Sequence, residues 1–369
     1  GDVPWIDKVL SDTDLEALQA PRTPRAQVAQ NMLEDLKYAE ENIKPDGDGN
    51  NTINVHVVRA LISRFGLYEG TWRKYHNQED AETYLRVSAE ASAKLVKDFP
   101  TLISNYDEIF NSEELVGQPG IILAKQYATD LVTHSITRVI RSSAWYADVT
   151  KDAVDSYLCT DGRPISTSKV YEGDKDIYAQ FRNRDRRLYE TVCHRGVADF
   201  SIDGQDGEPV TITNQMQTGF GMMKLIQPTK EMPSYSTISD ADVIILRYAE
   251  VLMMIAEAEN EVNGPTQKVY DAVNQIRVRS GQPELPTGLT KEQMRERIRN
   301  EWRVEFVFEG HRYFQLKRWK LMEKLVNGAA DPALPTYIKV FKPAFYYFPL
   351  PQSEIDKAGG VLVQDPNYI

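Results

Sequence analysis

The sequence has little cysteine and little histidine. It contains two cysteines, Cys159 and Cys193, and five histidines in 369 residues. No two histidines lie four residues apart, and the cysteines have no histidine partners at short spacing, so no metal site is indicated. We therefore expect neither a metal nor a cofactor. For the cysteines we favour two free, buried thiols, with a disulfide as the alternative in an oxidising compartment.

Long hydrophobic runs and basic blocks are also missing. No run of about 18 apolar residues is present that would predict a transmembrane helix. The 43 basic and 54 acidic residues give a net charge of −11. The sequence contains no long run of lysine and arginine, so nucleic acid is disfavoured as a partner. A hydrophobic content of 41% excludes disorder as the dominant state. The chain is therefore expected to fold around a large core.

The common catalytic signatures are absent as well. No HExxH, GxSxG or GxxxxGK[ST] motif occurs, which removes the usual zinc-peptidase, serine-hydrolase and P-loop assignments. Asp46, Asp48 and Asn50 match the first ligands of a calcium loop. However, Asn51 replaces the required glycine and Val57 replaces the bidentate glutamate, so we interpret residues 44–51 as a solvated turn.

Apolar residues in the first hundred positions recur with helical spacing. They predict helices over residues 26–43, 54–72 and 80–97, joined by short turns. The apolar faces are expected to contain Val28, Met32 and Leu36 in the first helix, Val58, Leu61, Ile62, Phe65 and Tyr68 in the second, and Tyr84, Val87, Ala91 and Leu95 in the third. Antiparallel helices joined in this way are typical of tetratricopeptide-like repeats.

The rest of the chain divides by composition. Residues 101–240 are rich in glycine, proline, serine and threonine, with short β-prone runs such as 210–213, and we expect a loop-rich insert. Helices are predicted again over 244–262, 267–279 and 291–308, the last with a capping box from Thr290 to Gln293. The expected organisation is a helical scaffold at 1–100 and 241–330, the insert at 101–240, and an extended segment at 331–369.

A run of glutamates offers one catalytic alternative. Glu301, Glu305 and Glu309 share a helix face, and paired carboxylates can hydrolyse glycosides. The same stretch carries arginines, which would keep a carboxylate ionised and unsuited to act as a general acid. We therefore favour an ion-pair network over a glycosidase. The arginines of this stretch are Arg297, Arg299, Arg303, Arg312 and Arg318.

Aromatic residues in the insert suggest a ligand platform. Trp145 and Tyr146 lie among loops, near polar residues that include Asp148 and Asn183, with Arg184 and Asp185 beside the latter. Sugar rings stack on aromatic faces, and their hydroxyls pair with planar polar side chains, so this group predicts carbohydrate binding. The alternative is that the aromatics pack the loops onto the helices. We assign Trp72, Trp302 and Trp319 to the core.

Several ordered motifs resemble the SusD/RagB family of cell-surface nutrient-binding proteins. They are residues 246–258 (LRYAEVLMMIAEA), 272–279 (AVNQIRVR), 308–319 (FEGHRYFQLKRW), 348–355 (FPLPQSEI) and 364–368 (QDPNY). Three shorter stretches extend the likeness upstream: 1–4 (GDVP), 68–76 (YEGTWRKYH) and 161–164 (DGRP). Together they cover almost the whole chain.

The resemblance implies a mainly α fold, in which a tetratricopeptide-like scaffold carries a loop-rich insert with short strands. It also implies a glycan-binding lipoprotein of the outer membrane, without enzymatic activity, that works with a SusC-like TonB-dependent transporter. In the family a lipid-anchored segment precedes the GDVP motif, so we expect this chain to be N-terminally truncated. A helical glycosidase using Glu301 and Glu305 and a protein-interaction scaffold remain as alternatives.

Overall fold

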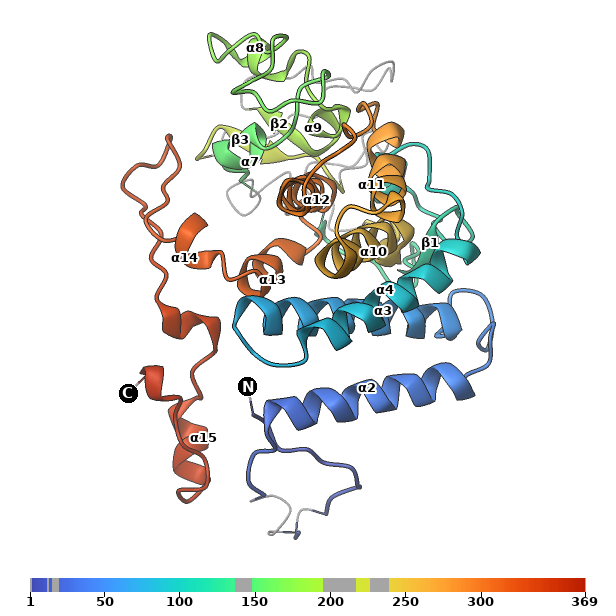
Figure 1. Cartoon of the computed structure of the whole chain (residues 1–369), viewed down its shortest axis with the longest axis vertical. Helices are drawn as coiled ribbons and strands as arrows, with labels where there is room; N and C mark the ends of the chain where they lie inside the picture. The colour runs from blue at the N-terminus through green and yellow to red at the C-terminus, as the bar shows by residue number, and fades with distance from the viewer. Residues whose placement is uncertain are drawn as a thin grey trace.

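The computed structural model describes residues 2–11, 13–14, 20–136, 148–194, 217–225 and 239–368 (Figure 1). Three helices form the N-terminal part of the scaffold, namely α2 (Arg25–Asn42), α3 (Val55–Tyr75) and α4 (Ala81–Asp98). They confirm the three predicted helices with shifts of a few residues. Asn54 caps α3, because its Oδ1 accepts hydrogen bonds from the backbone N–H groups of His56 and Val57 at 3.0 and 3.1 Å.

Two glycines bring α3 and α4 close together. A Cβ atom at Gly66 would lie 2.8 Å from the carbonyl oxygen of Tyr84, and one at Gly70 would lie 2.8 Å from the backbone nitrogen of Leu85. The two helix backbones therefore touch where side chains would normally separate them. The predicted apolar faces are partly wrong, because Met32 on α2 and Leu61 on α3 are exposed.

The C-terminal half of the scaffold is built around one buried helix, α10 (Tyr248–Asn263). Helix α10 packs on α3 and α4 and on the later helices α11 and α12. The helices after it are α11 (Gln267–Arg279), α12 (Lys291–Glu305), α13 (His311–Arg318) and α14 (Met322–Leu325). The Thr290–Gln293 capping box begins α12 as predicted. The fold is mainly α with a tetratricopeptide-like scaffold, which confirms the predicted class.

The insert consists of loops with short elements, as expected. Its helices are α5 (Glu108–Asn111), α7 (Lys151–Asp155), α8 (Ile177–Phe181) and α9 (Arg186–Thr191), and its strands are β1 (Ile121–Lys125), β2 (Val192–His194) and β3 (Phe220–Met222). Strands β2 and β3 pair antiparallel, and β1 pairs antiparallel with β4 (Val243–Arg247). In Figure 1, α7, α8, α9, β2 and β3 gather beyond α12, on the side away from α2. The predicted strand at 210–213 lies outside the described residues.

Two predicted helix boundaries are wrong. The apolar run at 244–246 belongs to β4, because its β-branched residues pair with β1 before the helical spacing starts at Tyr248. Helix α12 ends at Glu305 and not at 308. Phe308 then takes a left-handed conformation with φ of 64°, and Gly310 follows with φ of 81°, so the chain turns into α13.

The C-terminal segment is less extended than predicted. It contains the short helices η2 (Pro343–Tyr346), α15 (Gln352–Lys357) and η3 (Pro366–Tyr368), and in Figure 1 it descends beside the scaffold. Trp72 anchors it, since the indole ring contacts Tyr346 edge-on and stacks on His76. Trp72, Trp302 and Trp319 are all buried, as predicted. Within the described ranges no helix is long and apolar enough to cross a bilayer.

Candidate functional site

Two pockets lie on either side of the junction between α12 and α13. The larger has a volume of about 690 Å³ and the smaller about 530 Å³. Trp302, Phe308 and Gln315 line both pockets and so form the wall between them. The larger pocket also receives residues from α3, β4 and α10, and the smaller one receives residues from α7 and from the loop after α14.

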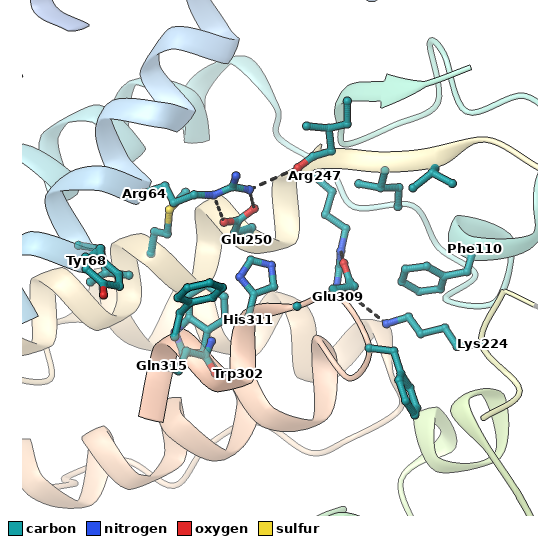
Figure 2. Close-up of a pocket in the computed structure, with 18 of the residues that line it drawn as sticks. Arg64, Tyr68, Phe110, Lys224, Arg247, Glu250, Trp302, Glu309, His311 and Gln315 are labelled. Atoms are coloured by element: carbon teal, nitrogen blue, oxygen red, sulfur yellow. Dashed lines mark hydrogen bonds and ion pairs between the residues drawn. The ribbon is translucent and has the colours of Figure 1, made fainter. Parts of the chain in front are cut away.

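Ion pairs neutralise the charges that line the larger pocket (Figure 2). Arg64 makes two hydrogen bonds to Glu250 at 2.6 and 2.7 Å. Glu309 accepts from Arg247 and from Lys224, whose Nζ lies 2.7 Å from Oε1 of Glu309. Burial lowers the pKa of Lys224 to about 8, although Glu309 opposes this shift. These charges are already satisfied, so a ligand in the larger pocket meets little net charge.

The polar groups left in this pocket are neutral hydrogen-bonding groups. Gln315 is only 3% exposed, and neither atom of its amide has a hydrogen-bond partner; the indole N–H of Trp302, also 3% exposed, has none either. An unpaired buried polar group costs roughly 1–3 kcal/mol. Figure 2 shows His311 projecting from α13 toward the Arg64–Glu250 pair. Burial lowers the pKa of His311, which favours its neutral form.

Aromatic rings stand beside these groups. Phe308 and Phe314 line the pocket with 40% and 54% of their surface exposed, and Tyr68 lines it from α3. Both phenylalanine rings therefore offer exposed apolar surface at the pocket. The larger pocket therefore combines apolar faces with neutral donors and acceptors.

The smaller pocket has a different electrostatic character. Trp302 and Phe306 supply its apolar part, and Arg303 and Arg312 supply positive charge. Nη2 of Arg303 lies 2.5 Å from Oδ2 of Asp152, whereas Arg312 has neither a hydrogen bond nor an ion pair among the described residues. This pocket is thus lined by one paired and one unpaired guanidinium.

Of the four predicted site residues, the structure describes Asp148 and Asn183, and these two do not line the same pocket. Asp148 lines the smaller pocket, and its Oδ2 accepts from the backbone N–H groups of Gln217 and Thr218 at 2.7 and 3.1 Å. Asn183 lines neither pocket, and its amide donates to the carbonyl of Val170 at 3.1 Å. Its neighbours Arg184 and Asp185 are buried and are unavailable to a sugar. Trp145 and Tyr146 lie outside the described residues.

The glutamates at 301 and 305 form an ion-pair network, as expected, but with different arginines. Glu305 is fully buried and accepts from Arg187, Arg247 and Arg279 at 2.6 to 2.8 Å. Burial would raise the pKa of Glu305, but the three arginines outweigh burial and lower it. Glu301 is paired with Arg277, and neither carboxylate lines a pocket.

Arginines of residues 297–318 were expected to pair with these glutamates, but several of them pair with other acidic residues. Arg318 pairs with Glu257 and Arg303 pairs with Asp152. The arginines that pair with Glu305 come from α9, β4 and α11, and the spacing of charges within α12 gives no sign of them. The arrangement gives a glycosidase mechanism no accessible acid at these positions.

The remaining sequence predictions concern possible metal and thiol sites. Cys159 carries a buried free thiol. Residues 44–51 form a turn in which Nζ of Lys44 bonds Oδ1 of Asp48 at 2.5 Å. Across the described ranges, no group of three or more histidine, cysteine, aspartate or glutamate side chains is placed to hold a metal.

Sequence reasoning missed the residues of the pocket wall. The sequence pattern places Trp302 in the core, and Phe308 and Gln315 enter only as part of the motif at 308–319. One signal was available: an aromatic–acidic–glycine sequence at 308–310 interrupts a helical pattern, which indicates a sharp turn and an exposed aromatic. Pairing of the surrounding charges is not visible in the sequence.

The helical-repeat scaffold thus carries two pockets of ligand size, and Glu301 and Glu305 are buried in ion pairs away from both. The chain belongs to the SusD family, since the model of that family matches residues 119–368.

Individual relatives agree with this assignment. The SusD-like protein P2 of Formosa agariphila is 24% identical over 379 aligned residues, which cover 100% of this chain and 70% of that protein. A SusD-like protein of Bacteroides fragilis has a similar structure, with a TM-score of 0.76, 24% identity and coverage of 100% of this chain and 76% of the other. A SusD-like carbohydrate-binding protein of the same species gives a TM-score of 0.74 at 20% identity, covering 96% and 74%.

Proposed function

We propose that this protein binds oligosaccharides at the outer-membrane surface and that the larger pocket holds the sugar. One observation carries the proposal. The exposed faces of Phe308 and Phe314 stand in the same pocket as the partnerless amide of Gln315. A sugar ring offers both counterparts, because its C–H face packs on an aromatic ring while its hydroxyls donate and accept hydrogen bonds.

The electrostatics of the pocket favour this type of ligand over a charged one. Arg64, Arg247 and Lys224 are already paired with glutamates, so an anion would have to compete with a carboxylate for each of them. Neutral hydroxyl groups need no such exchange. A rotation of the Gln315 side chain into the pocket would pair its amide with a hydroxyl and recover part of the roughly 1–3 kcal/mol that the unpaired group costs.

Membership of the SusD family supports the wider role. We propose that a lipid anchor holds the protein on the outer membrane, and that a SusC-like TonB-dependent transporter receives the captured glycan without cleavage. A solved relative is described as a carbohydrate-binding protein. Co-purification of the transporter with this protein from cells that make both would test the partnership, and its absence in mild detergent would argue against it.

We propose that residues of the insert at 101–240 add further contacts to the bound glycan. Asp148 lines the smaller pocket and follows Tyr146 by two positions in the chain. We therefore keep Trp145 and Tyr146 as a proposed stacking platform, with Asp148 and Asn183 as proposed polar contacts. Replacing Trp145 with alanine should weaken glycan binding by ~1–3 kcal/mol.

The test is calorimetric titration of the purified protein with a broad panel of neutral and acidic oligosaccharides. Phe314→Ala should weaken binding of the best ligand by ~1–3 kcal/mol, because an exposed stacking ring is lost. Tyr38→Ala is the control, since it removes a 68% exposed ring from α2 that lines neither pocket. Failure of the whole panel to bind would contradict the proposal. Cleavage of a bound glycan would contradict the absence of catalysis.

A further inference from the structure

Arg312 differs from every other arginine that lines the two pockets. Arg64 pairs with Glu250, Arg247 with Glu309, Arg318 with Glu257 and Arg303 with Asp152. Arg312 projects from the first turn of α13 into the smaller pocket and, within the described part of the chain, has no hydrogen-bond or ion-pair partner. The Arg312 side chain is half-buried and lines the pocket.

The surroundings of Arg312 disfavour its charge. Burial, followed by repulsion from Arg303, lowers the pKa of Arg312 to about 10, and the attraction of Asp152 only partly offsets this. The side chain nevertheless stays protonated at neutral pH. A partly desolvated cation without a counter-ion destabilises the fold, and a group of this kind that lines a pocket is a candidate for pairing with a ligand.

Each acidic residue that lines the pocket pairs with a group other than Arg312. Asp152 pairs with Arg303, and Asp331 accepts from the backbone N–H groups of Lys151 and Ala333 at 2.8 and 2.9 Å. Oδ2 of Asp148 accepts from two backbone N–H groups, and its Oδ1 is buried without a partner. None of these side chains pairs with Arg312, and Lys339 adds a further positive charge to the lining.

We propose that the smaller pocket binds the carboxylate or sulfate group of an acidic sugar, with Arg312 as the direct ion-pair partner. The proposal rests on the glycan-binding function and names its substrate class. The planar guanidinium can donate two parallel hydrogen bonds to such an anion, while the partly exposed ring of Phe308 offers an apolar face to the sugar ring. Because Phe308 and Gln315 line both pockets, a neutral sugar of the same oligosaccharide can lie in the larger pocket.

Matched pairs of oligosaccharides test the charge requirement. The carboxylate pair is oligogalacturonate and its methyl ester, and the sulfate pair is a carrageenan oligosaccharide and its desulfated form. Within at least one pair, the wild type should bind the acidic form at least tenfold more tightly, and added NaCl should reduce that difference. Equal or tighter binding of the neutral form in every pair that binds would overturn the proposal.

Variants then identify the residue. Arg312→Gln should abolish the preference for the acidic form and leave binding of the neutral form within about twofold, and Arg312→Lys should restore part of the preference. Arg86→Gln is the control, because it removes the same charge from an exposed pair with Glu82 on α4. A preference that survives in Arg312→Gln refutes the role of this residue.

Thermal unfolding separates a binding role from a structural one. The melting temperature of Arg312→Gln should equal or exceed that of the wild type, because the variant loses an unpaired cation and no hydrogen bond; a drop of several degrees would instead indicate a structural role. Failure of the wild type to bind any oligosaccharide, neutral or acidic, would refute glycan binding itself. Binding of neutral forms alone would refute only the acidic-sugar proposal.

Discussion

Arg247 and Glu305 are joined by a hydrogen bond of 2.7 Å from Nη1 to Oε1, which connects the end of β4 to the last turn of α12. The same guanidinium reaches Glu309, which lies just after α12 and lines the larger pocket. One buried arginine therefore holds both the scaffold helix and the turn that leads into α13. The position of the pocket wall depends on this pairing.

Replacing Glu305 with glutamine should destabilise the fold strongly. The variant leaves Arg187, Arg247 and Arg279 without the carboxylate that they share, and breaking a buried ion pair from one side costs about 3–5 kcal/mol. Urea unfolding should show a lower free energy of unfolding by about that amount. Glu296→Gln on the exposed side of α12 should change it by less than ~0.5 kcal/mol, and similar losses in both variants would contradict the network role.

The scaffold could be predicted because each helix carries its own signal. The apolar spacing of α2, α3 and α4 and the Thr290 capping box are local features, and local features are encoded within a few residues. The start of α10 was missed because the run 244–246 becomes a strand only through pairing with β1, which is more than a hundred residues away. Tertiary contacts of this kind decide between helix and strand in short apolar runs.

The site was less predictable for the same reason. Glutamates at helical spacing indicated an ion-pair network, but the partners come from three other elements and cannot be read from the spacing. The free guanidinium of Arg312 is an even stronger example. Five arginines occur between 297 and 318, and only the folded structure shows that Arg312 lines a pocket with no ion-pair partner among the described residues.

The carboxyl group of Asp107 should make stability depend on pH. Burial, with added repulsion from Glu190, raises the pKa of Asp107 from its usual 3.8 to about 7. The folded state therefore binds an extra proton between pH 4 and 7, so this group reduces stability as the pH rises through that range. Asp107→Asn should be more stable than the wild type at pH 8, by at most ~4 kcal/mol, and should lose this advantage near pH 4.

Chemical denaturation at several pH values measures this effect. The side chain of asparagine retains an oxygen that can accept the hydrogen bond that Asn111 donates at 2.6 Å, so the change removes charge with little loss of contacts. A difference between variant and wild type that is the same at pH 4.5 and pH 8 would show that Asp107 titrates at an ordinary pH.

Gly66 should resist substitution even though it lies inside a helix. Alanine favours helices over glycine by about 1 kcal/mol, so helix preference alone would make Gly66→Ala stabilising. The new methyl group would instead meet the carbonyl oxygen of Tyr84 at 2.8 Å and the backbone nitrogen of Ser88 at 2.9 Å, and α3 and α4 would have to separate. We expect a loss of ~1–3 kcal/mol in the free energy of unfolding. A stabilised variant would show that the two helices pack less tightly.

Gln315 should show a trade-off between stability and binding. Both atoms of its amide are buried without partners, so Gln315→Leu, which has similar volume, should raise the free energy of unfolding by ~1–3 kcal/mol. The same change removes the hydrogen-bonding group shared by the two pockets and should weaken glycan binding at least tenfold. Thermal unfolding and calorimetric titration of one preparation measure both quantities.

A matched control separates the two effects. Gln282 is also buried, has an amide oxygen without a partner and lines neither pocket. Gln282→Leu should therefore leave glycan affinity unchanged whatever it does to stability. If Gln315→Leu becomes more stable and loses affinity while Gln282→Leu keeps its affinity, the unpaired amide is retained for ligand binding. If Gln315→Leu binds as tightly as the wild type, the wall between the pockets does not contact the sugar.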